Sequence, residues 1–422
     1  MSEPTPAAPI RPASPASVPP EAAAAATKAP ARASIVILAL ALGGFTIGTT
    51  EFSAMSLVPY FSVGLGISEA TAAHVISAYA LGVVVGAPLI AVLAARVDRR
   101  MLLVALMSLY GIANLISAVT PTYELMLIAR FAAGLPHGAY FGVASLMAAS
   151  LVPRNRRTTA VARIMIGLTI ATIVGVPLNV VLGQGIGWRA GFVLSAALAF
   201  VTVAAIWVFA PRGTGPRSTA SSLRELAALG NRQVLLALLT GAVAFGGVFA
   251  IYTYVASTLL TITRVAPGMV PWYFLLFGVG MTIGTMLAGW AADRAQTPTI
   301  FGIMVFAVVL YGSFGLVAES PVLLAVFVTL VGMTGCLSTP VQARLMDVAG
   351  EAQTMAAAMN HAAFNVANAA GPWAASIFIA AGYPFTVAGW VGVAMALAGM
   401  VVFALAVLDE KRRRLIIADQ AS

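Results

Sequence analysis

Long apolar runs recur along nearly the whole chain and limit the folds that it can adopt. The hydrocarbon core of a bilayer takes about 20 apolar residues in one helix. Only 9% of the 422 residues are charged and 60% are hydrophobic, whereas soluble domains carry about 25% charged residues. Too few charges remain to cover a water-facing surface, so the sequence predicts an all-α integral membrane protein. Twelve spans are predicted, at residues 34–60, 71–94, 101–119, 123–150, 158–183, 189–210, 234–262, 269–292, 298–317, 321–345, 353–380 and 384–408.

The segments outside these spans have a different composition. Residues 1–32 are rich in Pro and Ala with almost no large apolar side chain, which predicts a disordered tail. A polar segment at 211–233 separates the sixth and seventh spans and predicts a linker between a bundle at 33–210 and a bundle at 234–409. Residues 410–422 form a short basic tail.

Basic residues are distributed unequally between the two sides of the predicted bundle. If both termini are cytoplasmic, nineteen Arg and Lys residues fall on the cytoplasmic side, and only Arg189 and Arg264 fall in outer loops. This asymmetry follows the positive-inside rule and predicts that both termini are cytoplasmic. The net charge of +9 has the same origin, because the basic residues cluster in short loops. We therefore expect no nucleic acid as a partner.

The two halves share a glycine pattern at an offset of 198 residues. Gly82 and Gly86 correspond to Gly280 and Gly284, and each pair is a GxxxG step that lets helices approach closely. The pattern predicts two copies of a six-helix unit. The alternative is that glycine is common in membrane helices. The same offset also relates Gly43 to Gly241, Gly48 to Gly246, Gly134 to Gly332, Gly191 to Gly389 and Arg96 to Arg294.

The stretch GTTEFSAMSLVP (48–59) contains Glu51, the one charged residue between Ala33 and Ser68. An ionised acid at the bilayer centre costs about 3 kcal/mol. A low dielectric favours the neutral form of a carboxylic acid, which can take up a proton at one face of the membrane and release it at the other. We expect Glu51 to carry a coupling proton. A packing role, in which Glu51 is hydrogen-bonded to a neighbouring helix, is the alternative.

Two further ionisable residues lie in the apolar stretch LIARFAAGLPHGAYFG (127–142). Arg130 is a permanent charge and needs a partner or water at this depth. His137 follows seven residues later, about two turns along the same face. We expect both to adjust the proton site around Glu51. A structural histidine at a kink caused by Pro136 is an equal alternative for His137.

A second polar face is predicted in span 353–380. His361, Asn365 and Asn368 are spaced i, i+4 and i+7 and therefore share one side of a helix. Together with Tyr252 and Tyr254 in the seventh span, they are candidates for a substrate cavity. Polar contacts between helices and interfacial anchoring of the tyrosines are the alternatives.

Four stretches resemble the major facilitator superfamily, and the resemblance covers nearly all of the chain after the first tail. TTEF (49–52) is similar to a first-helix motif, and RFAAG (130–134) to the Arg-Phe-x-x-Gly motif of the fourth helix. The loop GAPLIAVLAARVDRRMLL (86–103) resembles the superfamily's Gly-x-Leu-Ala-Asp-Arg-x-Gly-Arg-Arg loop but has Ala95 for Asp and Asp98 for Gly. GWAADRAQ (289–296) resembles its second copy.

The fourth stretch, IGLTIATIVGVPLN (166–179), resembles the fifth-helix Gly-Pro signature of antiporters, with Asn179 where relatives have Gly. The resemblance is strongest to the twelve-span drug:proton antiporter branch, near the arabinose-efflux-permease-like and sugar-efflux transporters. It implies latches between the halves on the cytoplasmic side, made by charged residues at helix ends; plain positive-inside anchoring is the alternative. The residues to which it assigns conformational roles are Arg96, Asp98, Arg99, Arg100, Gly175, Pro177, Gly289, Asp293 and Arg294.

The resemblance implies a major facilitator fold with twelve helices in two pseudo-symmetric halves, working by alternating access. We expect a proton-coupled exporter of a small sugar or drug-like molecule, neutral or singly charged, monomeric in a bacterial inner membrane. Its partners would be that substrate, protons and the lipid bilayer. An importer or facilitator, and a non-transporting sensor or scaffold, are the alternatives.

An enzyme is not expected. Lys28 and Lys411 follow Thr and Glu rather than the glycine of a Walker motif. The three histidines and the single Cys336 show no metal-ligand spacing, so we expect neither a metal nor a cofactor.

Overall fold

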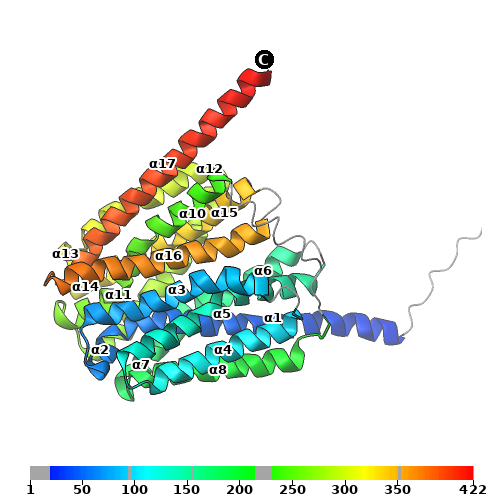
Figure 1. Ribbon diagram of the computed structural model, residues 1–422, viewed down its shortest axis with the longest axis horizontal. Coiled ribbons are helices and arrows are strands. Elements are labelled where there is room, and N and C mark those ends of the chain that lie inside the picture. The colour runs from blue at the N-terminus through cyan, green and yellow to red at the C-terminus, as the bar shows by residue number, and fades with distance from the viewer. Residues whose placement is uncertain (1–19, 94–96, 154–155, 214–230, 350–352, 422) are drawn as a thin grey trace, which may run out of the picture.

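The computed structural model describes residues 20–93, 97–153, 156–213, 231–349 and 353–421, and every regular element within these ranges is a helix. The helices run side by side along the long axis of the molecule (Figure 1). The first half holds α1 (Pro20–Ser56), α2 (Val58–Leu65), α3 (Glu69–Leu93), α4 (Arg99–Val119), α5 (Tyr123–Ser150), α6 (Arg157–Ile170), η2 (Ala171–Gly175), α7 (Val176–Gly185) and α8 (Trp188–Phe209). The second half holds α10 (Arg232–Ala244), α11 (Gly246–Thr261), η4 (Pro267–Met269), α12 (Val270–Gly312), α13 (Phe314–Val317), α14 (Pro321–Thr334), η5 (Gly335–Leu337), α15 (Ser338–Ala349), α16 (Gln353–Ala380) and α17 (Val387–Ala421).

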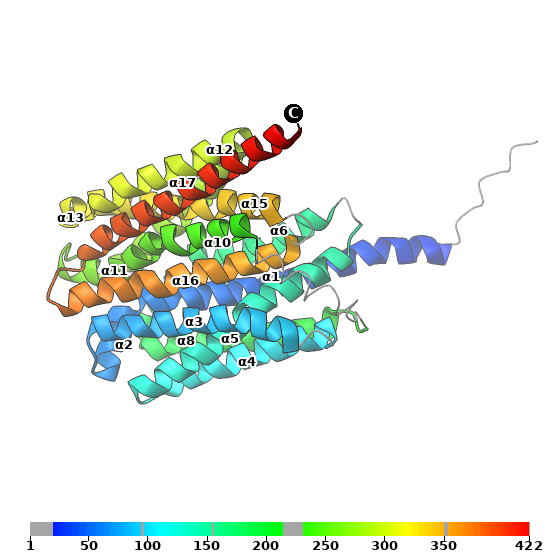
Figure 2. The ribbon, with the colours of Figure 1, turned by 45° about the horizontal axis from the view of Figure 1, so that its top comes forward.

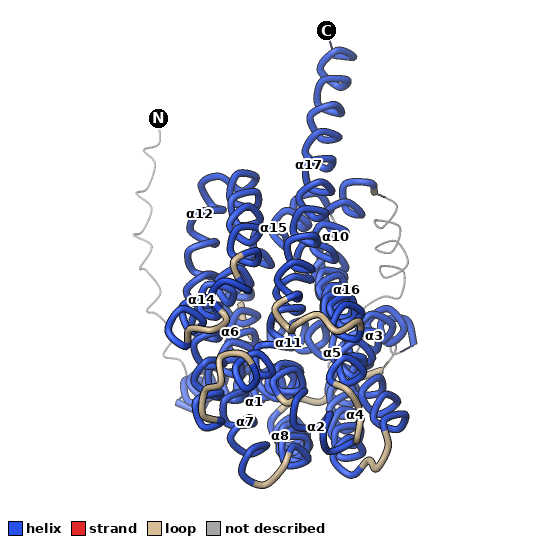
Figure 3. The backbone as a smooth tube through the Cα atoms, turned by 90° about the vertical axis from the view of Figure 1, so that its left-hand side faces the viewer, coloured by secondary structure: helices blue, strands red, loops and turns tan. Residues whose placement is uncertain are grey.

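The two halves of the chain form two groups of helices. In Figure 3, α10, α12, α15 and α17 lie above α1, α4, α7 and α8. In Figure 2, α1 begins and α17 ends toward the same end of the molecule. We call this the terminal end, and the end that carries α2 and α13 the distal end.

The predicted glycine steps set the same helix crossing in each half. A Cβ at Gly82 or Gly86 of α3 would overlap the backbone of α5 at Phe131 and Leu135. Gly280 and Gly284 of α12 face the backbone of α14 in the same way. Because only hydrogen atoms separate the two backbones, the helices approach more closely than any larger residue permits. The internal repeat predicted from the sequence is thus visible as a repeated packing contact.

Nine candidate spans meet the length and apolarity expected of a membrane helix in the described part of the chain. One of them, Pro267–Gly312, is 46 residues long and contains non-helical backbone at Ala295, so it corresponds to two predicted spans. Spans 123–150 and 353–380 are predicted at the bounds of α5 and α16, which are not among the nine. The all-helical, membrane-spanning fold is as predicted, and the count of twelve stays a prediction.

Both ends of the chain are more helical than their composition suggested. Helix α1 begins at Pro20, so residues 20–32 are helical where a disordered tail was predicted. The sequence EAAAAATKA at 21–29 explains this, because Ala, Glu and Lys are strong helix formers. Residues 1–19 lie outside the described residues. At the other end, α17 continues to Ala421 through the predicted basic tail and extends beyond the bundle (Figure 1).

Contacts between the halves reach from the middle of the molecule to the distal end. Phe52 of α1 packs against Tyr252 of α11, with ring centroids 5.5 Å apart, and against Phe277 of α12 at 6.5 Å. At the distal end, the side chain of Gln184 donates to the carbonyl of Pro267 at 2.8 Å. Each aromatic pair adds about 0.5–1.5 kcal/mol beyond its buried area. These contacts hold the halves together on the distal side of the centre.

Candidate functional site

Glu51 lies at the contact between the two halves. Its side chain is buried, with 7% of its surface exposed. Asn368 of α16 donates from Nδ2 to Glu51 Oε1 at 2.9 Å, across 317 residues of sequence. His137 of α5 places Nδ1 4.0 Å from Glu51 Oε2. Three of the residues singled out in the sequence therefore come together from α1, α5 and α16.

From His137 the chain of polar groups continues to other helices of the first half. Tyr79 of α3 lies with its hydroxyl 2.9 Å from His137 Nδ1. The hydroxyls of Tyr79 and Tyr110 lie 3.4 Å apart, and both side chains are fully buried. The distance from His137 to Glu51 is too long for a direct hydrogen bond. A proton passing between these two groups therefore needs a bridging water or a small rotation of either side chain.

Arg130 lies next to this chain of polar groups and forms no ion pair with Glu51. Its guanidinium lies 4.4 Å from the centre of the Tyr79 ring and 5.4 Å from that of Phe192. It also donates to Asn114 Oδ1 at 3.2 Å. Aromatic faces and an amide oxygen compensate a buried cation in part. Arg130 therefore joins this group through Tyr79 and Asn114 and not through an ion pair with Glu51.

The predicted polar face of α16 points toward the first half. The His361 ring stacks on Phe141 of α5, with centroids 5.5 Å apart and planes 3° from parallel. Asn365 donates to the His361 carbonyl at 3.0 Å. The side-chain oxygens of Asn365 and Asn368 are buried and have no hydrogen-bond donor among the described residues. Buried amide oxygens without a donor are costly, and they are suited to bind hydroxyl or N–H groups of a ligand.

The two predicted tyrosines of α11 lie in different surroundings. Tyr252 belongs to the aromatic contact between the halves, with its ring centroid 5.5 Å from that of Phe52 of α1. Tyr254 stacks on Phe385 at 5.8 Å, within the second half. Residues two apart on a helix point roughly 200° away from each other. The structure thus brings Tyr252, and not Tyr254, toward the group around Glu51.

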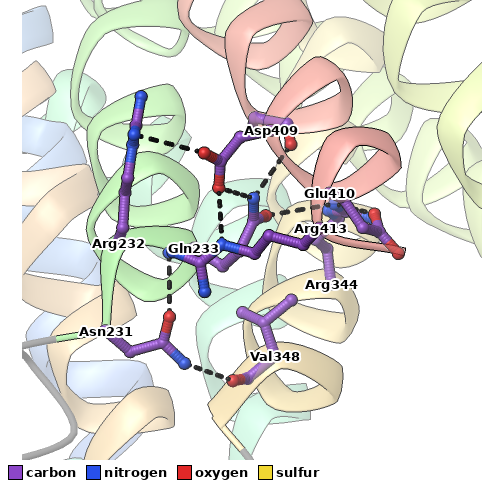
Figure 4. A network of polar contacts seen from close by, with 9 residues as sticks. Asn231, Arg232, Gln233, Arg344, Val348, Asp409, Glu410 and Arg413 are labelled. Atoms are coloured by element: carbon purple, nitrogen blue, oxygen red, sulfur yellow. Dashed lines mark hydrogen bonds and ion pairs between the residues drawn. The ribbon is translucent and has the colours of Figure 1, made fainter. Parts of the chain in front are cut away.

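A second polar cluster lies at the terminal end of the second half and joins α10, α15 and α17 (Figure 4). The buried Arg344 donates to Glu410 at 2.5 Å, and Gln233 donates to Asp409 at 2.8 Å. Arg232 also pairs with Asp409 at 3.3 Å. All of these residues belong to one half, so the cluster compensates Arg344 and anchors α17 without crossing to the first half.

The Major Facilitator Superfamily model matches residues 40–264 and 254–421, nearly the whole described chain. The chain belongs to the Major Facilitator Superfamily. It is 38% identical to the inner membrane transport protein YdhP of Escherichia coli (strain K12), over 87% of this chain and 95% of the relative. It is 34% identical to a chloramphenicol resistance protein of Streptomyces lividans, over 80% of this chain and 87% of the relative.

The fold matches that of a solved member at low sequence identity. A mutant of the nucleoside transporter NupG superposes with a TM-score of 0.70 at 14% identity, covering 87% of this chain and all of that one. These likenesses confirm the family resemblance found in the sequence. They also show a membrane transporter rather than an enzyme, as predicted.

The superfamily's loop motifs make contacts within their own halves in this structure. Asp98 caps α4 by accepting the backbone N–H groups of Arg100 and Met101, at 3.0 and 3.2 Å. Arg294 donates to the Trp290 carbonyl at 2.7 Å and stacks on its ring. The predicted latch between the halves is not formed by these side chains in this conformation. No contact between the halves is described for Arg99 or Gly289. The Asp293 side chain is exposed, and Arg96 lies outside the described residues.

The antiporter-like signature of the fifth helix forms a local irregularity beside Glu51. Residues Ala171–Gly175 form a π-helical turn, η2, which ends directly before the helix that contains Pro177. A Cβ at Gly175 would overlap the side chain of Thr49, two residues before Glu51. π-Helical turns often mark functional sites and bends. The signature therefore fits α7 closely against the part of α1 that carries the buried acid.

Tyr79, Tyr110 and Asn114 were missed by the sequence reasoning. Each lies inside an apolar span, where a buried polar side chain needs a partner. That signal was present in the sequence for all three. It was not decisive, because tyrosine is also common at membrane interfaces.

Proposed function

We propose that this superfamily member exports a small neutral or singly charged molecule in exchange for protons. The observation that carries the proposal is the hydrogen bond from Asn368 of the second half to the buried Glu51 of the first half. The proposal includes twelve spans, cytoplasmic termini and a monomer in a bacterial inner membrane. The relative YdhP is named an inner membrane transport protein, which supports the location.

The Glu51–Asn368 contact links a protonation site to the packing of the halves. As a carboxylate, Glu51 accepts the amide N–H of Asn368. After gaining a proton, Glu51 can donate to the Asn368 side-chain oxygen, which has no donor among the described residues. A substrate that binds Asn368 competes for the same amide. Since substrate and proton then act on one equilibrium, each alters the affinity for the other.

The chemistry around the site favours an uncharged or singly charged substrate. Asn365 and Asn368 offer amide oxygens to hydroxyl or N–H donors, and Phe141 offers an aromatic wall. Glu51 is the single acid in this group, so a dication would lack compensation. The name of the chloramphenicol resistance relative fits a neutral drug-like molecule.

Proton release from proteoliposomes tests the proposal. Purified wild type and Glu51→Gln are compared across a panel of sugars and neutral drugs. The amide of Gln keeps a hydrogen-bond acceptor for Asn368 but cannot exchange a proton, so we expect substrate-driven proton release to be lost. Glu124→Gln, an exposed acid at the distal start of α5, is the matched control and should retain it. Equal release from wild type and Glu51→Gln would refute this assignment and make His137 or His361 the next candidate for the proton site.

The direction of transport needs a separate experiment, because an importer or facilitator would have the same architecture. Inverted membrane vesicles expose the cytoplasmic face to the medium. An exporter accumulates substrate inside such vesicles when their interior is acidified. Accumulation only in right-side-out vesicles would show import, and a cellular phenotype preserved in Glu51→Gln would favour a sensor or scaffold.

A further inference from the structure

A cavity of about 490 Å³ lies at the terminal end of the first half, away from Glu51. It is formed where α4 begins and α8 ends. None of its residues belongs to the polar chain around Glu51 or to the cluster of the second half. Its lining residues are Arg100, Trp207, Val208, Ala210, Pro211 and Arg212.

Arg100 is a buried cation whose hydrogen bonds are incomplete. Only 4% of its surface is exposed. Its Nη2 donates to the Trp207 carbonyl, and its guanidinium lies 4.7 Å from the centre of the Trp207 ring. Its Nε is buried and has no acceptor among the described residues. A guanidinium has five N–H donors in a fork that matches phosphate oxygens.

The side chain of the neighbouring Asp98 forms no ion pair with this cation. Asp98 accepts the backbone N–H groups at the start of α4 and is not part of the cavity lining. Arg212 adds a second positive charge to the lining and is exposed. Among the described residues that line it, the cavity therefore has two cations, one of them buried, and no acid.

Exposed apolar side chains lie in the lining of the cavity and at the start of α4. Trp207 and Val208 have 49% and 66% of their surfaces exposed, and Met101 at the start of α4 has 47%. Both helices end here, at the predicted boundary between hydrocarbon and headgroups. Exposed apolar side chains can contact an acyl chain, and the two arginines near them can bind a phosphate. This combination favours a lipid over a free anion.

The second half does not repeat the lining residues of this cavity. At the offset of the internal repeat, Pro298, Leu405 and Glu410 occupy the positions of Arg100, Trp207 and Arg212. The arrangement is therefore not a by-product of the repeated fold.

We propose that this cavity binds the phosphate of an anionic phospholipid. Arg100 and Arg212 contact the phosphate oxygens, Trp207 lies beside the glycerol, and one acyl chain follows the exposed face of α8. The site is independent of the proposed proton coupling, because it shares no residue with the Glu51 site.

Native mass spectrometry of the delipidated, detergent-purified protein tests the site. The probe is dioleoyl phosphatidylglycerol, with dioleoyl phosphatidylcholine for comparison. We expect wild type to retain one phosphatidylglycerol tightly, and Arg212→Gln to bind it about tenfold more weakly, as expected for one charged hydrogen bond. Arg100→Gln should weaken it at least as much. Arg212 carries the test if Arg100→Gln fails to fold, since Arg212 is exposed.

Arg294→Gln is the matched control. Its guanidinium also stacks on a tryptophan, Trp290, at 4.0 Å, but neither residue lines the cavity. Retention should therefore equal wild type. Equal loss in Arg212→Gln and Arg294→Gln, or no loss in either, would overturn the proposal. Displacement of the lipid by millimolar inorganic phosphate would show a free-anion site instead and would overturn the lipid assignment.

Discussion

Replacing Asn368 by Leu tests how strongly one hydrogen bond holds the halves together. Leucine has a similar size but cannot donate a hydrogen bond to Glu51. The change therefore removes the 2.9 Å hydrogen bond and leaves the side-chain volume nearly the same. A hydrogen bond contributes about 1 kcal/mol to a neutral acceptor and up to about 3 kcal/mol to a charged one. If the contact is made only in this conformation, its loss shifts the conformational equilibrium by roughly 5- to 150-fold.

The shift can be measured as a distance across the distal end. Ile186 of the first half and Met269 of the second flank the Gln184–Pro267 contact and are 75% and 49% exposed. Spin labels at Ile186→Cys and Met269→Cys, in a Cys336→Ala background, report whether the halves meet there. We expect Asn368→Leu to add a population at longer distance in double electron–electron resonance.

Asn365→Leu is the control for this measurement. It lies on the same face of α16, but its amide donates to the His361 carbonyl of its own helix. Its distance distribution should match that of the parent. An unchanged distribution in Asn368→Leu, or the same change in both variants, would refute the reasoning that the Glu51–Asn368 bond holds the halves in this conformation.

Three further outcomes are expected. Gly82→Val forces a side chain into the backbone of α5 and should destabilise the protein by about 1–3 kcal/mol or more in thermal unfolding, whereas Gly142→Ala, which faces open space, should change little. Asp98→Ala removes the cap of α4 and should cost about 1 kcal/mol in the same assay. Tyr79→Phe removes the hydroxyl 2.9 Å from His137 and should alter the pH profile of transport without altering the distal distances; an unchanged profile would exclude Tyr79 from the proton path.

The superfamily and the position of the buried acid were accessible from the sequence because both depend on local features. The length of an apolar run is set by the thickness of the bilayer, so spans can be found without knowledge of their neighbours. The GxxxG steps predicted close helix contacts, and Gly82 and Gly280 make them. The i, i+4 and i+7 spacing placed Asn365 and Asn368 on one face. Those local features indicate that the protein spans a membrane, which residues share a helix face and which residues are candidates for the site.

The partners of those residues were decided by the tertiary structure. Asn368 and Glu51 are 317 residues apart, and no periodicity relates positions on different helices. The packing of α16 against α3 and α5 brings Asn368 to Glu51. Other contacts between helices place Tyr254 against Phe385 and Tyr79 between Arg130 and His137. Helix periodicity states which residues share a face, while only the packing of all the helices determines what that face meets.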